Sequence, residues 1–173
     1  MTRSLDALTP DTRAAIELLL EHAAGLGMDI QINETRRTCA RQNQLFAQGR
    51  ETEGKILTGA RGCRSWHVHG RAVDLITKGP QSIPPYRALG DFWKGLGGKW
   101  GGDFKGLDDY GHFEWHPGFG ITDVCLDVDG CVVQEHAPVY PQLPGRGGSG
   151  IGWVLAAGLA GTAAYLVLRG RRG

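Results

Sequence analysis

One residue of this sequence that is well suited to metal binding or catalysis is an aspartate inside an apolar run. Asp74 lies within residues 72–76, whose other members are alanine, valine, leucine and isoleucine. A buried carboxylate without a partner is costly, so Asp74 needs a cation, a hydrogen-bond network or a metal ion. His67 lies seven positions earlier, and Gly70 between them allows the backbone to turn. The two side chains can therefore converge on a metal from a bent segment, whereas on one helix they would lie about 10 Å apart.

A second cluster of ionisable residues occupies residues 108–116 and includes His112. A catalytic zinc usually takes three protein ligands and keeps one open position, and His112 added to the first pair gives two imidazoles and one carboxylate. A further carboxylate beside the metal can take a proton from the attacking water and pass it to the leaving amine. Asp109, three residues before His112, is the expected base. Glu114 is the alternative base, although orienting a ligand or binding substrate suits it better.

Other histidines nearby leave alternatives open. His69 could replace His67 as a ligand, since His-x-His is a workable pair, but we expect it to line the cleft or support a ligand. His116 follows His112 at helical spacing, yet Pro117 and Gly118 argue against a continuing helix. We therefore expect His116 to be a cleft residue. Each histidine taken alone could also be purely structural.

Two motifs connect these residues to a known family. The first is Ser-x-His-x-x-Gly-x-Ala-x-Asp over residues 65–74, and the second is Asp-x-x-His over residues 109–112. Together they resemble the zinc peptidases related to D-alanyl-D-alanine dipeptidases and carboxypeptidases, and the resemblance covers roughly residues 4–118. It implies that Zn²⁺ is bound by His67, Asp74 and His112, with Asp109 as the general base.

The region between residues 35 and 50 also resembles the N-terminal block of that family. Family members place an arginine there that contacts the region of the scissile carbonyl, and Arg37, just before Thr38, matches it best. The chemical role is clear, because a fixed cation stabilises a tetrahedral oxyanion.

The identity of the base bears on the substrate. The D-alanyl-D-alanine enzymes generally carry glutamate at the position of Asp109, whereas phage endolysins that act as L-alanyl-D-glutamate endopeptidases carry aspartate. Residues 100–104 also resemble those endolysins. We therefore expect a phage or prophage lysis enzyme, a zinc-dependent endopeptidase that cuts peptidoglycan stem peptides. The alternatives are a D,D-carboxypeptidase acting on D-Ala-D-Ala ends and a non-catalytic zinc module that binds peptidoglycan.

Helical and strand patterns alternate along the first 137 residues, which predicts an α+β domain. The expected fold is a small antiparallel sheet flanked by helices, with zinc in a cleft. Gly25 and Gly27 end the first helix, and Asp129-Gly130 is a strong hairpin turn. We expect helices over residues 10–25, 38–48 and 86–96, strands around residues 30–32, 72–76 and 112–115, loops over 54–65 and 80–85, and a hairpin over 124–133.

The four cysteines, Cys39, Cys63, Cys125 and Cys131, permit three disulfide connectivities that sequence alone cannot distinguish. Pairs Cys39–Cys63 and Cys125–Cys131 are reasonable if the domain meets an oxidising periplasm. Buried free thiols are an equally acceptable alternative. The spacings disfavour a tetrathiolate zinc site.

Beyond the zinc peptidase domain, expected over residues 1–137, the composition changes. Residues 138–150 are rich in proline and glycine and predict a flexible linker. Residues 151–168 carry no charge, and as a helix they would rise about 27 Å, close to the thickness of a bilayer core. We therefore expect a C-terminal transmembrane helix, followed by a basic tail over residues 169–173.

The charge balance and the N-terminal segment give further expectations about partners and location. The 19 Lys and Arg residues nearly cancel the 18 Asp and Glu residues, so no nucleic-acid partner is indicated. The N-terminus has no apolar stretch typical of a secretory signal. We expect a protein made in the cytoplasm of a bacterial host, anchored to the membrane by its C-terminal helix and acting on the cell wall from the periplasmic side. The sequence does not reveal whether the protein oligomerises.

Overall fold

The computed structural model describes residues 2–78, 83–106 and 108–134. The chain divides into two units, Met1–Leu143 and Pro144–Gly173, and the second unit lies wholly outside the described residues. Within the first unit a four-stranded antiparallel sheet has the order β1-β2-β4-β3. Its strands are β1 (Ile30–Glu34), β2 (Ala72–Thr77), β3 (Lys99–Trp100) and β4 (His112–Glu114). The predicted α+β class and antiparallel sheet are confirmed.

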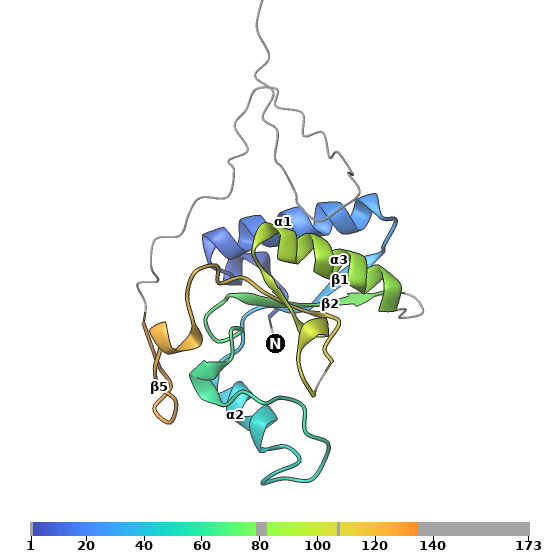
Figure 1. Cartoon of the computed structure of the whole chain (residues 1–173). Helices are drawn as coiled ribbons and strands as arrows, with labels where there is room; N and C mark the ends of the chain where they lie inside the picture. Colours follow the sequence, from blue (N-terminus) through green and yellow to red (C-terminus); the bar gives the residue numbers. More distant parts are fainter. Residues whose placement is uncertain (1, 79–82, 107, 135–173) are drawn as a thin grey trace, which may run out of the picture. The chain divides into compact units, whose positions relative to one another are not determined.

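Two helices cover one face of this sheet. Figure 1 shows α1 (Pro10–Gly25) and α3 (Ile83–Leu96) side by side over the strands. The inward residues of α1 are Ala15, Ile16, Leu19 and Ala23, the spacing of an amphipathic helix, and they join Trp93 of α3 in the main core. The predicted bounds of α1 are confirmed, while α3 begins three residues earlier than expected, at Ile83 rather than residue 86.

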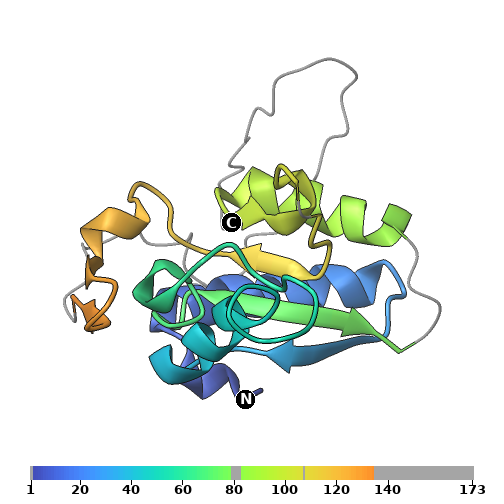
Figure 2. The same ribbon diagram turned by 90° about the horizontal axis from the view of Figure 1, so that it is seen from below.

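The opposite face of the sheet carries a third helix and irregular segments. Seen from below in Figure 2, α2 (Cys39–Ala47) and the loop after it lie over the strands on the side away from α1 and α3. The Thr38 hydroxyl accepts a hydrogen bond from the backbone N–H of Arg41 and so caps α2. Four short 3₁₀ turns occur elsewhere in the part of the chain that the structure describes: η1 (Leu5–Ala7), η2 (Gly62–Arg64), η3 (Gly101–Asp103) and η4 (Ile121–Asp123).

Side chains along the two central strands, β2 and β4, point alternately to the two faces of the sheet, so apolar residues enter the core and ionisable residues lie on the other face. On β2, Val73 and Leu75 are buried in the core against the helices, so Asp74 between them faces the other side. On β4, Phe113 enters the same core, which turns its neighbours His112 and Glu114 to the face of Asp74. The sheet therefore presents its ionisable side chains on the face that α1 and α3 leave open.

Strand β3 was not predicted. Its two residues follow Gly97 and Gly98 and are too few to show a periodic pattern. Trp100 is 1% exposed, and its indole Nε1 donates to the carbonyl of Tyr110 over 2.9 Å. This strand thus ties the loop before β4 to the edge of the sheet.

The last described element is a hairpin of β5 (Cys125–Asp127) and β6 (Val132–Val133), as the sequence predicted. The expected disulfide pairing, however, is wrong. Cys39 pairs with Cys131 and Cys63 with Cys125, with Cα–Cα distances of 6.2 and 5.2 Å.

The reason lies in how the hairpin packs. A Cβ atom on Gly62, whose φ is +54°, would lie 2.5 Å from the carbonyl oxygen of Val128 in the hairpin turn. The hairpin therefore lies directly against η2, so its cysteines meet Cys39 at the start of α2 and Cys63 within η2 rather than each other. Loops of 92 and 62 residues are closed in this way, which restricts the unfolded chain strongly.

The expected linker, transmembrane helix and basic tail, residues 138–150, 151–168 and 169–173, all lie outside the described residues. Among the helices that are described, none is both long and apolar enough to span a bilayer.

Candidate metal centre and active site

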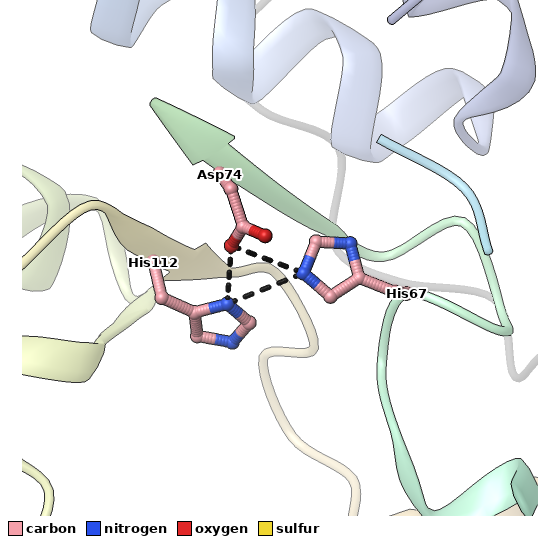
Figure 3. A group of neighbouring side chains, drawn as sticks. All are labelled: His67, Asp74 and His112. Carbon is pink, nitrogen blue, oxygen red and sulfur yellow. Dashed lines mark hydrogen bonds and ion pairs between the residues drawn. The ribbon is translucent and has the colours of Figure 1, made fainter. Parts of the chain in front are cut away.

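Three of the predicted residues meet at one point. His67 Nε2, Asp74 Oδ1 and His112 Nδ1 converge, as the close-up in Figure 3 shows. The separations are 3.1 Å from His67 to Asp74, 2.8 Å from His112 to Asp74 and 3.3 Å between the two imidazole nitrogens. The structure thus brings together the three ligands that the sequence indicated, from a turn and two adjacent strands.

A sharp turn places His67 beside the sheet. The backbone carbonyl of His67 accepts hydrogen bonds from the N–H groups of Gly70 and Arg37, over 3.2 and 3.0 Å. Gly70 has a φ of +66°, and a Cβ atom there would lie 2.8 Å from the carbonyl oxygen of Ala7. Only glycine fits such a position without strain. The turn that the sequence required between His67 and Asp74 is therefore present.

Each imidazole is oriented through its second nitrogen. His67 Nδ1 lies 2.5 Å from the carbonyl oxygen of Thr35, to which it donates, leaving Nε2 free to bind a metal. His112 Nε2 lies 3.0 Å from Glu114 Oε1, which leaves Nδ1 directed at Asp74. Partners of this kind fix the tautomer and ring orientation of metal-binding histidines. Glu114 thus takes the orienting role that suited it best in the sequence.

The charges of the cluster favour binding of a cation. Burial alone would raise the pKa of Asp74, but hydrogen bonds from His112 and His67 outweigh it and hold that pKa well below its usual range. Burial would likewise lower the pKa of His112, yet Asp74 and Glu114 raise it to about 10. The two carboxylates therefore hold a proton on His112, and a metal ion must displace that proton to bind.

The donor set fits zinc. Two imidazoles and a carboxylate are ligands that zinc prefers, at bond lengths of about 2.0–2.2 Å. Neighbouring ligand atoms of a tetrahedral site with such bonds lie roughly 3.3 Å apart. Two of the observed separations, 3.1 and 3.3 Å, lie close to that spacing and the third, 2.8 Å, is shorter. Three protein ligands leave one position of a tetrahedron open.

The cluster opens into a cavity of about 880 Å³. His67, Asp74 and His112 line it together with the two predicted catalytic residues, Arg37 and Asp109. Its rim includes the apolar side chains of Leu57 and Phe104. The cavity is thus large enough for several residues of a peptide and brings all five predicted site residues to one space.

Asp109 lies on the turn that leads into β4. Its backbone N–H donates to the carbonyl of Gly101 and its carbonyl accepts from the N–H of His112, both over 3.1 Å. Although the residue as a whole is exposed, its carboxyl group is partly desolvated inside the cavity, and this burial raises its pKa. A carboxylate with a raised pKa holds a proton more readily, as a general base must.

Arg37 is held from several sides. Its Nε donates to Glu34 Oε1 over 3.1 Å and its Nη2 to Glu34 Oε2, while Nη1 donates to Gln42 Oε1 over 2.6 Å. Nη2 also lies 3.6 Å from Asp74 Oδ2. Neither Glu34 nor Gln42 was predicted as part of the site.

His69 and His116, the other histidines considered from the sequence, do not join the metal cluster. His69 Nε2 lies 2.6 Å from the carbonyl of Cys63, and burial lowers its pKa. The expectation that His116 lines the cleft is wrong, since it is not among the residues that line the cavity and instead stacks on Trp66 with ring centroids 3.9 Å apart. Its Nε2 lies 3.2 Å from Glu114 Oε2, so it supports the carboxylate that orients His112.

Replacing Glu114 with glutamine is expected to weaken zinc binding by about 10–100-fold, the usual cost of losing such a supporting group. Hydrogen bonds from His112 and His116 offset burial and lower the pKa of Glu114 to about 2, so wild type presents a full carboxylate to His112. Competition with a chromogenic chelator measures the affinity. Equal affinities of wild type and variant would exclude an orienting role for Glu114.

Several known proteins are similar to this chain in sequence. Residues 58–115 match a family model described as D-alanyl-D-alanine carboxypeptidase. The chain is 34% identical over 124 residues to the peptidoglycan L-alanyl-D-glutamate endopeptidase CwlK of Bacillus subtilis (strain 168), covering 64% of this chain and 74% of that protein. It is 28% identical over 125 residues to the L-alanyl-D-glutamate peptidase of Listeria phage A118, covering 68% of this chain but only 41% of the phage protein.

A solved structure supports the fold. The vancomycin resistance D,D-pentapeptidase VanY, crystallised with Zn(II), superimposes with a TM-score of 0.50 at 18% identity, covering 67% of this chain and 82% of that one. The chain belongs to the D-alanyl-D-alanine carboxypeptidase family of peptidases, as its two motifs indicated.

Proposed function

We propose that this protein is a zinc-dependent peptidase that hydrolyses the peptide stems of bacterial peptidoglycan. The observation that carries the proposal is the convergence of His67, Asp74 and His112 on a cavity that Arg37 and Asp109 also line. When bound there, zinc would polarise the scissile carbonyl and make a neighbouring water more acidic. The presence of a base and a fixed cation beside the three ligands favours catalysis over mere binding, because a binding module needs neither.

The chain's own residues can perform the proton transfers and the charge stabilisation. The Asp109 carboxylate takes a proton from the attacking water and passes it to the nitrogen of the leaving amine. Arg37 has five N–H groups, of which three are used by Glu34 and Gln42. The second N–H of Nη1 therefore remains to stabilise the negative charge that develops on the carbonyl oxygen, whereas Nη2 also lies 3.6 Å from Asp74 Oδ2.

We further propose that the bond cut is that between L-alanine and D-glutamate. The aspartate at position 109 supports this choice, and so do the names of the relatives from Bacillus subtilis and the Listeria phage. A D,D-carboxypeptidase acting on D-Ala-D-Ala is the second candidate, favoured by the description of the family model.

Mass spectrometry of digested peptidoglycan separates the two activities. Purified protein loaded with one zinc ion is incubated with cross-link-free muropeptides that carry the full pentapeptide. An endopeptidase of the proposed specificity leaves L-alanine on the sugar and releases a peptide that begins with D-glutamate. Release of free D-alanine instead would replace the first specificity with the second.

We also propose, from sequence alone, that residues 151–168 attach the protein to the membrane of a bacterial host and that it acts on the wall as a phage or prophage lysis enzyme. Support comes from eighteen consecutive residues without charge, followed by three arginines within residues 169–173. The full chain is expected in the membrane fraction of expressing cells and a chain ending at residue 137 in the soluble fraction. Equal partitioning of the two chains would rule out attachment through this segment.

A further inference from the structure

The contacts of Arg37 single out a residue that the proposed mechanism does not use. Glu34 places both carboxylate oxygens on the arginine, one on Nε and one on Nη2. This two-point arrangement fixes the plane of a guanidinium group, which a single contact does not. Glu34 is 3% exposed, so the pair is shielded from water and both charges depend on each other.

A bulge in β1 brings Glu34 to the site. Ile32 lies opposite Leu75 and Glu34 opposite Asp74, so β1 advances two residues while β2 advances one. Simple alternation would turn Glu34 to the core side with Ile30 and Ile32. The extra residue in β1 reverses this direction. The Glu34 side chain therefore lies on the same face of the sheet as that of Asp74, the residue opposite it on β2.

Gln42 completes the support of Arg37 on a third side. The Gln42 side chain is fully buried, and while its Oε1 accepts from Arg37 Nη1, its Nε2 donates to the carbonyl of Ala60 over 2.6 Å. The backbone N–H of Arg37 is itself bonded to the carbonyl of His67. Arg37 is therefore fixed at both its backbone and its head group, immediately beside the metal cluster.

Asp74 is the other carboxylate within reach of Arg37. Its Oδ2 lies 3.6 Å from Arg37 Nη2, while its Oδ1 is the ligand atom of the cluster. A buried arginine that lost Glu34 would have its strongest remaining partner in Asp74. Such a pair would draw Asp74 away from the two histidines.

We propose that Glu34 is a positioning residue that holds Arg37 at its distance of 3.6 Å from Asp74 and prevents a direct hydrogen bond between them, and so preserves both the metal ligand and the orientation of the arginine toward substrate. The effect on the ligand concerns this chain alone. The effect on catalysis rests on the proposed peptidase function.

Two variants separate this role from simple structural support. Glu34→Gln leaves Arg37 charged but without the carboxylate that pairs with it. The variant is expected to weaken zinc binding by about 10–100-fold. It is also expected to lower kcat, measured at saturating zinc, by about a hundredfold, as misplacement of a catalytic group does. Adding Arg37→Met removes the competing cation. The double variant is expected to regain zinc affinity close to that of wild type while kcat stays low, because it lacks the arginine.

Asp11→Asn provides the matched control. It removes the carboxylate that lies 2.8 Å from Arg71 Nη1, a second arginine with a buried side chain, at a place that does not line the cavity. A lower melting temperature with unchanged zinc affinity and kcat is expected. If Glu34→Gln shows no cooperative melting transition, Glu34→Asp replaces it, with the same expected rescue of zinc affinity by Arg37→Met.

Zinc affinity is read by chelator competition and needs no substrate. Wild-type affinity in Glu34→Gln, or equally weak binding in the single and double variants, would overturn the role of Glu34. A wild-type protein that binds zinc but leaves muropeptides uncut would instead overturn the proposed peptidase function, and the affinities would still decide the role of Glu34.

Discussion

Asp109→Asn is expected to lower kcat by about 10²–10⁴-fold, the usual contribution of a general base. The side chain keeps its size and can still form hydrogen bonds, but an amide cannot accept the proton of the attacking water. Zinc content and KM are expected to stay near wild type, because Asp109 is not one of the three clustered ligands. Release of the cleaved peptide under saturating substrate measures kcat.

Asp103→Asn is the appropriate control for this substitution. Asp103 lies on the same stretch before β4, is exposed, and pairs with Lys94 over 2.9 Å rather than facing the cavity. It is expected to leave kcat unchanged. Full activity of Asp109→Asn would contradict the assignment and make Glu114, the other carboxylate considered from the sequence, the residue to examine next.

The second large effect concerns the metal ligands. His112→Ala is expected to abolish activity and stoichiometric zinc binding, because two ligands seldom hold catalytic zinc in competition with a chelator. His69→Ala is the matched control, since its ring contacts the carbonyl of Cys63 and not the cluster. That variant is expected to keep one zinc ion per chain.

Metal analysis after gel filtration in dilute chelator decides between these outcomes. Stripped wild-type protein should regain activity when zinc is added, whereas His112→Ala should not. A variant of His112 that retains one zinc ion, together with loss of zinc in His69→Ala, would mean that His69 replaces a predicted ligand.

The sequence predicted the metal cluster well because local signals determine it. An aspartate between apolar neighbours had to be buried beside positive charge, and Gly70 marked the turn that returns His67 toward it. Alternation on a short strand placed His112 and Glu114 on one face. The resemblance to the family then supplied Arg37, which composition and periodicity do not single out, and supported Asp109, which its place three residues before His112 had already indicated.

Features that depend on contacts between distant segments escaped prediction. Glu34 belongs to the site through a β-bulge, and a bulge leaves no mark in a pattern of alternating residues. The disulfide pairing depends on where the hairpin packs, so the nearest cysteines in sequence, Cys125 and Cys131, are not partners. The place of His116 under Trp66 is likewise a result of tertiary packing.

Hydrolysis of a defined peptidoglycan peptide in water enriched in ¹⁸O tests the central claim most directly. Wild-type protein carrying one zinc ion is expected to yield a fragment ending in L-alanine with one ¹⁸O atom in its new carboxylate, together with a peptide that begins with D-glutamate. The same protein stripped of metal is expected to yield neither. An uncut peptide in the presence of bound zinc, or equal cleavage without any metal, would contradict a zinc peptidase built on His67, Asp74 and His112.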